Sequence, residues 1–76
     1  MIMKNERTAK IVGERLKEAR KTAGYTQAKV AEIMYMTQQQ YSRFENGVFE
    51  LNYDQIIKLC QLLDITADYL FGLCEI

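Results

Sequence analysis

Side chains suited to contact nucleic-acid bases share one face of the stretch from residue 38 to residue 46. On a helix, which turns by about 100° per residue, Tyr41 and Phe44 fall on one side. A set of polar residues, none of them acidic, falls on the opposite side: Gln39, Ser42, Arg43 and Asn46. Glutamine can pair with adenine through two hydrogen bonds, and arginine can pair with guanine or bind phosphate. The pattern therefore predicts a surface for duplex DNA, with a merely soluble polar face as the alternative.

Two short helices joined by an abrupt turn must hold this surface. In the first, Val30, Ala31 and Met34 recur at helical spacing. Thr26 and Thr37 stand immediately before the two periodic segments, where N-cap residues are expected. The sequence thus predicts one helix over about residues 27–34 and a second that begins after Thr37.

The second of these helices carries its own start and stop signals. Thr37 is followed three residues later by Gln40, so the two side chains can close a capping box. This capping role explains Gln40 without any contact to DNA. Asn46 and Gly47 are expected to end the helix, because glycine readily adopts a positive φ.

These residues give the stretch a resemblance to a known family. Thr26–Gln27, Ala31–Glu32, Thr37–Gln39 and Glu45–Gly47 match the helix-turn-helix pattern of the phage-repressor and Cro-like family, also called the xenobiotic-response-element type. The likeness runs from about Ile11 to Phe71. It implies a compact, all-α, repressor-like DNA-binding domain of five helices, in which the second and third helices form the helix-turn-helix.

The resemblance also implies roles for residues of the second motif helix. It places Gln38 and Gln39 where related repressors contact bases in the major groove, and the periodicity independently puts Gln39 on the outer face. Arg43, one turn after Gln39, can reach guanine or a phosphate. We predict that Ser42 and Asn46 contact phosphate.

Two residues near the start of the first motif helix are predicted to meet the DNA backbone. The resemblance implies a phosphate contact for Gln27. Lys29 stands at the third helical position, where a capping box favours glutamate. A cation near a helix N-terminus is unfavourable by about 0.3–1 kcal/mol, and a docked phosphate reverses that sign. We therefore predict a phosphate contact for Lys29, with an exposed solubilising lysine as the alternative.

A structural pair is expected between Arg20 and Glu45. Glu45 falls near the side of its helix that carries Tyr41 and Phe44, and a carboxylate there needs a partner. The resemblance implies Arg20, because the family places at this position the arginine that pairs with this glutamate. The pair would tie the first helix of the domain to the recognition helix.

Two positions depart from the family pattern. The family usually has a left-handed glycine just after the first motif helix, where this chain has Tyr35, so either the turn is strained or its geometry differs. Met36 should still insert into the core. Residues 48–50 lack the lysine or arginine that family members often place there, which predicts fewer backbone contacts on that side.

The remaining segments are expected to complete one domain over residues 8–71, after a flexible arm at residues 1–7 and before a tail at residues 72–76. A first helix is predicted over Thr8–Thr22, ended by Gly24, with Gly13 as a point of close packing. Its buried stripe is predicted to be Val12, Leu16, Ala19 and Ala23.

Two further helices are predicted after the motif. Asn52 should cap a helix that ends at Leu63, and Thr66 should cap a last one through about Phe71. The predicted core residues of the first of these two helices are Tyr53, Ile56, Leu59, Cys60 and Leu63.

The composition suits one small all-helical domain and excludes several function classes. The chain has 76 residues, is 49% hydrophobic and contains no proline, and no apolar run approaches the length of about 20 residues that a membrane span needs. It has no histidine, and Cys60 and Cys74 lack metal-ligand spacing and fit free thiols. We expect no enzyme, cofactor or metal, and we expect a cytoplasmic, nucleoid-associated location because no signal peptide is recognisable.

The charges are unevenly divided although their sum is zero. Residues 1–43 carry nine basic and four acidic side chains, whereas residues 44–76 carry one basic and six acidic ones. The two halves therefore have net charges of +5 and −5, and the basic half contains the helices predicted to meet DNA. Ordinary solvated surface charges are the alternative interpretation.

Apolar residues near the carboxyl end exceed what a small core can absorb: Ile57, Phe71, Leu73 and Ile76. Such a surplus suggests a protein–protein surface, with a frayed tail as the alternative. A homodimer is its natural use, because repressors of the resembled family read two half-sites about one helical turn apart. We expect a sequence-specific regulator of transcription that binds double-stranded DNA, acting as a dimeric repressor. The competing expectation is a protein-interaction module, such as an antitoxin or an anti-repressor-type partner, in which DNA binding is secondary.

Overall fold

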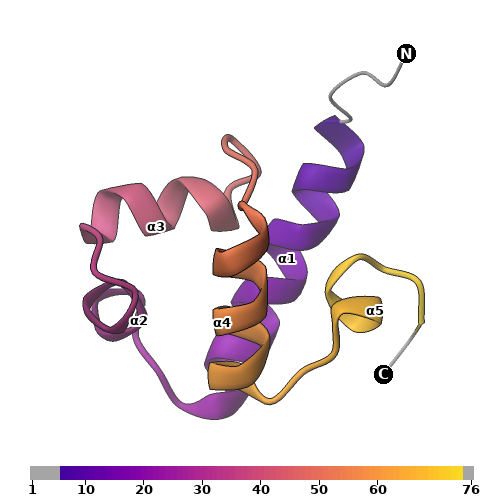
Figure 1. Ribbon diagram of the computed structural model, residues 1–76. Coiled ribbons are helices and arrows are strands. Elements are labelled where there is room, and N and C mark those ends of the chain that lie inside the picture. Colours follow the sequence, from indigo (N-terminus) through magenta and orange to yellow (C-terminus); the bar gives the residue numbers. More distant parts are fainter. Residues whose placement is uncertain (1–5, 75–76) are drawn as a thin grey trace.

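Residues 6–74 are described in the computed structural model, and within this range the chain forms five α-helices and no strand (Figure 1). They are α1 (Glu6–Ala23), α2 (Gln27–Ile33), α3 (Gln38–Glu45), α4 (Tyr53–Leu63) and α5 (Ala67–Leu70). In the view of Figure 1, α2 and α3 lie to the left of α1, α5 lies to its right, and α4 lies in front of it. The predicted all-α class is confirmed.

The core is built from all five helices of the described chain. Each helix contributes one side chain with no exposed area, and these residues are Leu16, Val30, Tyr41, Leu59 and Leu70. The five helices therefore share one core. Because α2 and α3 both pack into this shared core, their orientation depends on the other helices as well as on the turn between them.

Helix α1 is longer than predicted and buries a slightly different stripe. It begins at Glu6 and ends at Ala23, after which Gly24 takes a φ of +84°. Leu16 and Ala19 are buried as predicted, and Val12 is half-buried against the core. The prediction for Ala23 is wrong, because this residue is exposed in a shallow groove beside the loop between α4 and α5. Ala9, two turns before Leu16, is buried instead.

Both motif helices start as the sequence predicts. The Thr26 side chain accepts a hydrogen bond of 3.0 Å from the Lys29 backbone N–H. At α3 the Gln40 backbone N–H donates to Thr37 Oγ1 and the Thr37 backbone N–H donates to Gln40 Oε1, each at 3.0 Å. The capping box is thus complete, and it occupies the side-chain carbonyl of Gln40. Gly47, at a φ of +75°, follows the end of α3.

The turn between α2 and α3 keeps its left-handed residue although that residue is a tyrosine. Tyr35 has a φ of +59°, and its side chain is 89% exposed. The backbone N–H of Met36 donates to the carbonyl of Ala31 at 3.0 Å, and that of Tyr35 donates to Glu32 at 3.1 Å. These bonds close a Schellman-type turn. Of the two expected alternatives, the turn therefore keeps its usual geometry, and the backbone of Tyr35 is strained. Met36 packs against the core, as predicted.

Helix α4 shows the second wrong core prediction. Asn52 caps it through a box with Gln55, and Leu59 and Leu63 are buried. Tyr53, however, is 85% exposed. It is the first residue of the helix and borders an open cavity of about 230 Å³ between α1, the loop before α4 and Phe71, so no helix covers it.

Candidate nucleic-acid interface

Helix α3 has one buried and one exposed side. Tyr41, Phe44 and Glu45 are buried against the rest of the domain. The residues predicted to meet DNA lie on the opposite side: Gln38, Gln39, Arg43 and Asn46 are exposed, and Ser42 is half-buried. The four exposed side chains leave this face accessible to a large ligand.

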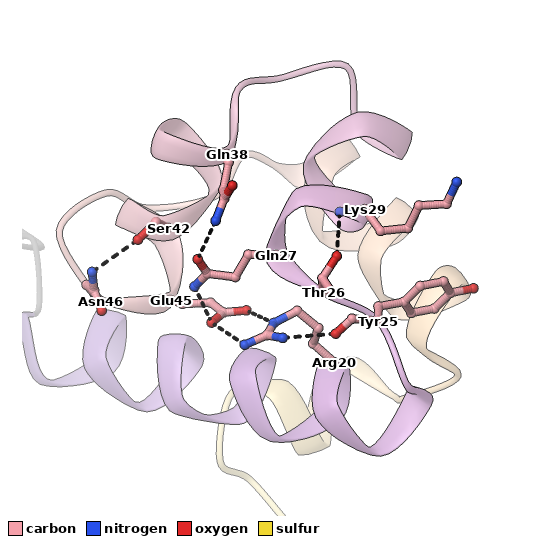
Figure 2. Close-up of polar contacts among 9 residues, drawn as sticks. All are labelled: Arg20, Tyr25, Thr26, Gln27, Lys29, Gln38, Ser42, Glu45 and Asn46. Carbon is pink, nitrogen blue, oxygen red and sulfur yellow. Dashed lines mark hydrogen bonds and ion pairs between the residues drawn. The ribbon is translucent and has the colours of Figure 1, made fainter.

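The buried side of α3 is held by an ion pair with α1. Arg20 Nε donates to Glu45 Oε2 at 2.7 Å, and Arg20 Nη2 lies 3.3 Å from Glu45 Oε1 (Figure 2). A third bond runs from Arg20 Nη1 to the carbonyl of Tyr25, at 2.9 Å. Arg20 is 8% exposed and Glu45 is 6% exposed. The structure therefore brings together the two residues that the resemblance implied as a pair.

The hydrogen bonds of Glu45 decide its protonation. Burial alone raises the pKa of the Glu45 carboxyl, but its interactions with Arg20, Tyr41 and Gln27 outweigh burial and leave that pKa below its ordinary value. The Glu45 carboxylate in turn raises the pKa of Arg20. Both groups are charged at neutral pH, so the pair provides a fixed ionic anchor beneath α3.

Gln27 joins this anchor to the exposed face. Its Nε2 donates to Glu45 Oε1 at 3.0 Å, and its Oε1 accepts a hydrogen bond of 3.5 Å from Gln38 Nε2 (Figure 2). An ionised carboxylate only accepts hydrogen bonds, so the amide nitrogen of Gln27 must face Glu45. One N–H of that nitrogen remains for another acceptor. Helical periodicity did not predict the bond between Gln27 and Glu45, since it gives no distance between two helices.

Helices α1 and α3 also touch directly, backbone against backbone. A methyl group placed on Gly13 would lie 2.3 Å from the carbonyl oxygen of Glu45 and 2.8 Å from that of Phe44. Only a residue without a side chain allows this approach. Gly13 is thus the predicted point of close packing, and it fixes the carboxyl end of α3 against α1.

The cations near this face are partly engaged within the protein. Lys29 lies on the exposed side of α2, and its Nζ is 3.5 Å from Glu32 Oε1. The Arg43 guanidinium lies over the Phe49 ring, 5.5 Å from its centre. Both side chains are exposed, so these contacts leave them accessible.

The end of α3 carries polar groups and then an apolar loop. Asn46 Nδ2 donates to Ser42 Oγ at 3.4 Å (Figure 2). In the loop that follows, Val48 and Phe49 are 53% and 47% exposed, and Phe49 meets Phe44 edge to face with ring centres 6.5 Å apart. The only charged side chain of residues 48–50 is Glu50.

Two negative findings apply to residues 6–74. This range holds no group of three or more acidic, cysteine or histidine side chains that could ligate a metal ion. None of its helices combines the length and apolarity needed to cross a membrane.

Comparison with known proteins agrees with this geometry. A family model described as a helix-turn-helix domain matches residues 13–74. The chain is 38% identical over 65 residues to the HTH-type transcriptional regulator ImmR of Bacillus subtilis strain 168, an alignment that covers 86% of this chain and 51% of ImmR. It is 36% identical over 58 residues to the SPbeta prophage-derived uncharacterized HTH-type transcriptional regulator YonR of the same organism, covering 76% of this chain and 54% of YonR. The chain thus spans about half the length of these relatives.

Proposed function

This chain belongs to the helix-turn-helix domain family, and we propose that it is a transcriptional regulator that binds double-stranded DNA at a specific sequence. The observation that carries the proposal is the exposed polar face of α3, which is anchored from below by the ion pair between Arg20 and Glu45. The names of the relatives, which describe transcriptional regulators, support the same function.

In this proposal α3 enters the major groove, and one set of side chains contacts bases while another binds phosphates. Gln38, Gln39 and Arg43 contact base edges, since amides and guanidinium groups match the hydrogen-bonding patterns of adenine and guanine. The backbone phosphates are bound by a second set: Gln27, Lys29, Ser42 and Asn46. The hydrogen bond to Glu45 fixes the Gln27 amide and leaves its second N–H for a phosphate. A phosphate bound there would set the register of the protein on the duplex.

We further propose that the protein acts as a dimeric repressor in the cytoplasm, bound to the nucleoid. Two copies related by a two-fold axis would read half-sites about 34–36 Å apart and so occupy an operator. The exposed apolar side chains outside the α3 face support a contact between copies, and Ile57 and Leu73 are 54% and 74% exposed.

A protein-interaction module is the second candidate, and exposed apolar residues, Ile57 among them, favour it as well. Phe49, Tyr53 and Ile57 are all exposed although they are large and apolar. A partner protein, as for an antitoxin or the target of an anti-repressor, could cover them instead of a second copy. In that case binding to DNA is secondary.

Selection from a random pool of duplex DNA tests the proposed function. We expect recovered sequences to share one motif with two half-sites, and we expect a labelled copy of that motif to shift in a gel. The shift should weaken as salt rises, because phosphate contacts release counterions. Recovery of no preferred sequence at either of two salt concentrations would favour the interaction module.

A further inference from the structure

We propose that Lys10 of α1, which lies outside the two motif helices, binds a DNA phosphate beside the carboxyl end of α3. The inference rests on the proposed function and adds a contact that the sequence did not predict. It concerns the side of the interface where residues 48–50 supply no cation.

The position of Lys10 follows from its contact with Gly47. A methyl group placed on Gly47 would lie 3.0 Å from both Cα and Cγ of Lys10 and 3.2 Å from its backbone nitrogen. The chain leaving α3 therefore rests directly on the Lys10 stem. Figure 1 shows this loop rising beside the amino-terminal half of α1. Lys10 is exposed, so its charged end can reach a ligand bound beside Gly47, two residues after the end of the proposed recognition helix.

A phosphate on this side needs such a cation. The carboxyl end of a helix carries a partial negative charge of roughly half an electron, which repels phosphate. Glu50 adds a full negative charge in the loop that follows. Arg43 lies over the Phe49 ring and is proposed to reach into the groove. Lys10 packs against Gly47, directly after the C-cap of α3, so its charge can offset that of a DNA phosphate bound there.

A purely structural role for Lys10 is the competing explanation. A cation beside the carboxyl end of a helix stabilises that helix with or without DNA. The two roles differ in what they change. Loss of a helix-stabilising charge lowers the melting temperature, whereas loss of a phosphate contact changes how strongly DNA binding depends on salt.

The test compares Lys10→Ala with Lys21→Ala. Lys21 is an exposed lysine in the last turn of the same helix, three turns from Lys10, and its groove with Arg15, Lys17 and Glu18 contains no residue assigned to DNA. Binding to a mixed-sequence duplex is measured between about 50 and 200 mM salt. We expect the slope of log K against log salt to become shallower by about 0.9 per bound protomer for Lys10→Ala. Lys21→Ala should keep the wild-type slope, and Lys10→Arg should keep it too.

Each other outcome has a defined meaning. An unchanged slope for Lys10→Ala, with or without a lower melting temperature, rejects the phosphate contact. An equal decrease of the salt slope in Lys21→Ala also rejects the phosphate contact, because the decrease then reflects the net charge of the protein. A mixed-sequence duplex reports phosphate contacts even where no sequence is preferred. If the wild-type protein binds duplex DNA without sequence preference, the proposed function is contradicted, but the Lys10 contact can still be tested. If the wild-type protein binds no duplex, the proposed function and the Lys10 contact are both rejected.

Discussion

At the scale of single residues, Glu45 connects the three helices of the proposed interface. Its carboxylate accepts hydrogen bonds from Arg20 of α1 and from Gln27 of α2, and it belongs to α3 itself. Because the carboxylate can only accept, it also orients the Gln27 amide and, through it, the amide of Gln38. One buried charge thus supports both the fold and the side chains proposed to meet DNA.

Removal of Glu45 should cost more than an ordinary polar contact. In Glu45→Ala the guanidinium of Arg20 is left buried without its partner, so we expect the free energy of unfolding to fall by about 3–5 kcal/mol. Urea unfolding followed by circular dichroism measures this loss. Replacing both partners, with Arg20→Met and Glu45→Leu, should recover a large part of it. A single-variant loss below about 1 kcal/mol is the size of an exposed pair and would contradict the buried anchor.

The acid stability of the domain should also depend on Glu45. Its pKa is lowered in the folded state, so its contribution to stability is fully present above the ordinary value of 4.5 and is lost as pH falls through the folded-state pKa. We expect the free energy of unfolding to decrease with falling pH in that window. Glu45→Gln should lose this part of the dependence while keeping the part that other carboxyl groups cause. Identical pH curves for the two proteins would show that Glu45 has the same pKa folded and unfolded.

Gln39 is the residue that best tests base recognition. It is exposed on α3, and the outward face and the family pattern agree on it. We expect Gln39→Ala to weaken binding to the selected site by about 1–3 kcal/mol and to relax the choice of base at one position. Gln61→Ala, an exposed glutamine on α4, is the matched control and should change neither. An equal loss on every sequence would mean that Gln39 does not read a base.

At the scale of elements, the sequence predicted helix boundaries better than it predicted burial. The caps were predictable because threonine, asparagine and glutamine act within a few residues of one another, as at Thr37 and Gln40. Ala23 and Tyr53 were wrong because both sit at a helix end. Periodicity gives the face of a helix, but it does not tell whether a neighbouring element extends far enough to cover the first or the last turn.

Contacts between helices were the part that the sequence predicted least. The pairing of Arg20 with Glu45 came from resemblance to a family and not from spacing. The bond between Gln27 and Glu45 and the contact between Lys10 and Gly47 had no local signal. Each of them depends on how two helices cross, which is decided by the shared core.

Gly13 is the residue where that crossing is most sensitive. In Gly13→Ala the added methyl group would meet backbone oxygen atoms of α3 that no side-chain rotation can move away. Alanine is favoured over glycine in a helix by up to about 1 kcal/mol, yet we expect the free energy of unfolding to fall by about 1–3 kcal/mol. Lys17→Ala, at an exposed position of α1, gives the control for helix propensity. A more stable Gly13→Ala protein would mean that α1 and α3 can separate at no cost.

At the scale of the whole molecule, the basic side chains and the large exposed apolar side chains come mainly from different halves of the chain. The positive half of the chain contains α1, α2 and most of α3, which meet at the proposed interface. The large exposed apolar side chains lie mainly in the second half, at Phe49, Tyr53, Ile57 and Leu73. The fourth residue of the predicted apolar surplus, Ile76, lies outside the described range. Phe49 lies under the Arg43 guanidinium at the proposed DNA interface, whereas Ile57 and Leu73 lie outside the motif helices and are the apolar residues that suit a contact with protein.

The proposed dimer can be tested at Ile57, which is 54% exposed on α4 and is distant in sequence from the residues assigned to DNA. If a second copy covers this side chain, a lysine in its place has two unfavourable choices. Its charge is buried against apolar groups, or the two copies separate and leave those groups exposed to water. Full burial of an isoleucine side chain contributes about 1.5–3 kcal/mol, so Ile57→Lys should weaken self-association by about 10-fold or more. Ile57→Val keeps the surface apolar and is the control.

Sedimentation equilibrium measures the association without DNA, and a gel shift on a single half-site shows whether each copy still binds. We expect Ile57→Lys to bind the half-site normally and to lose the tighter binding to the paired site. A wild-type chain that stays monomeric on the paired site, or an Ile57→Lys chain that associates as the wild type does, would place the contact between copies elsewhere and leave this surface to a different protein.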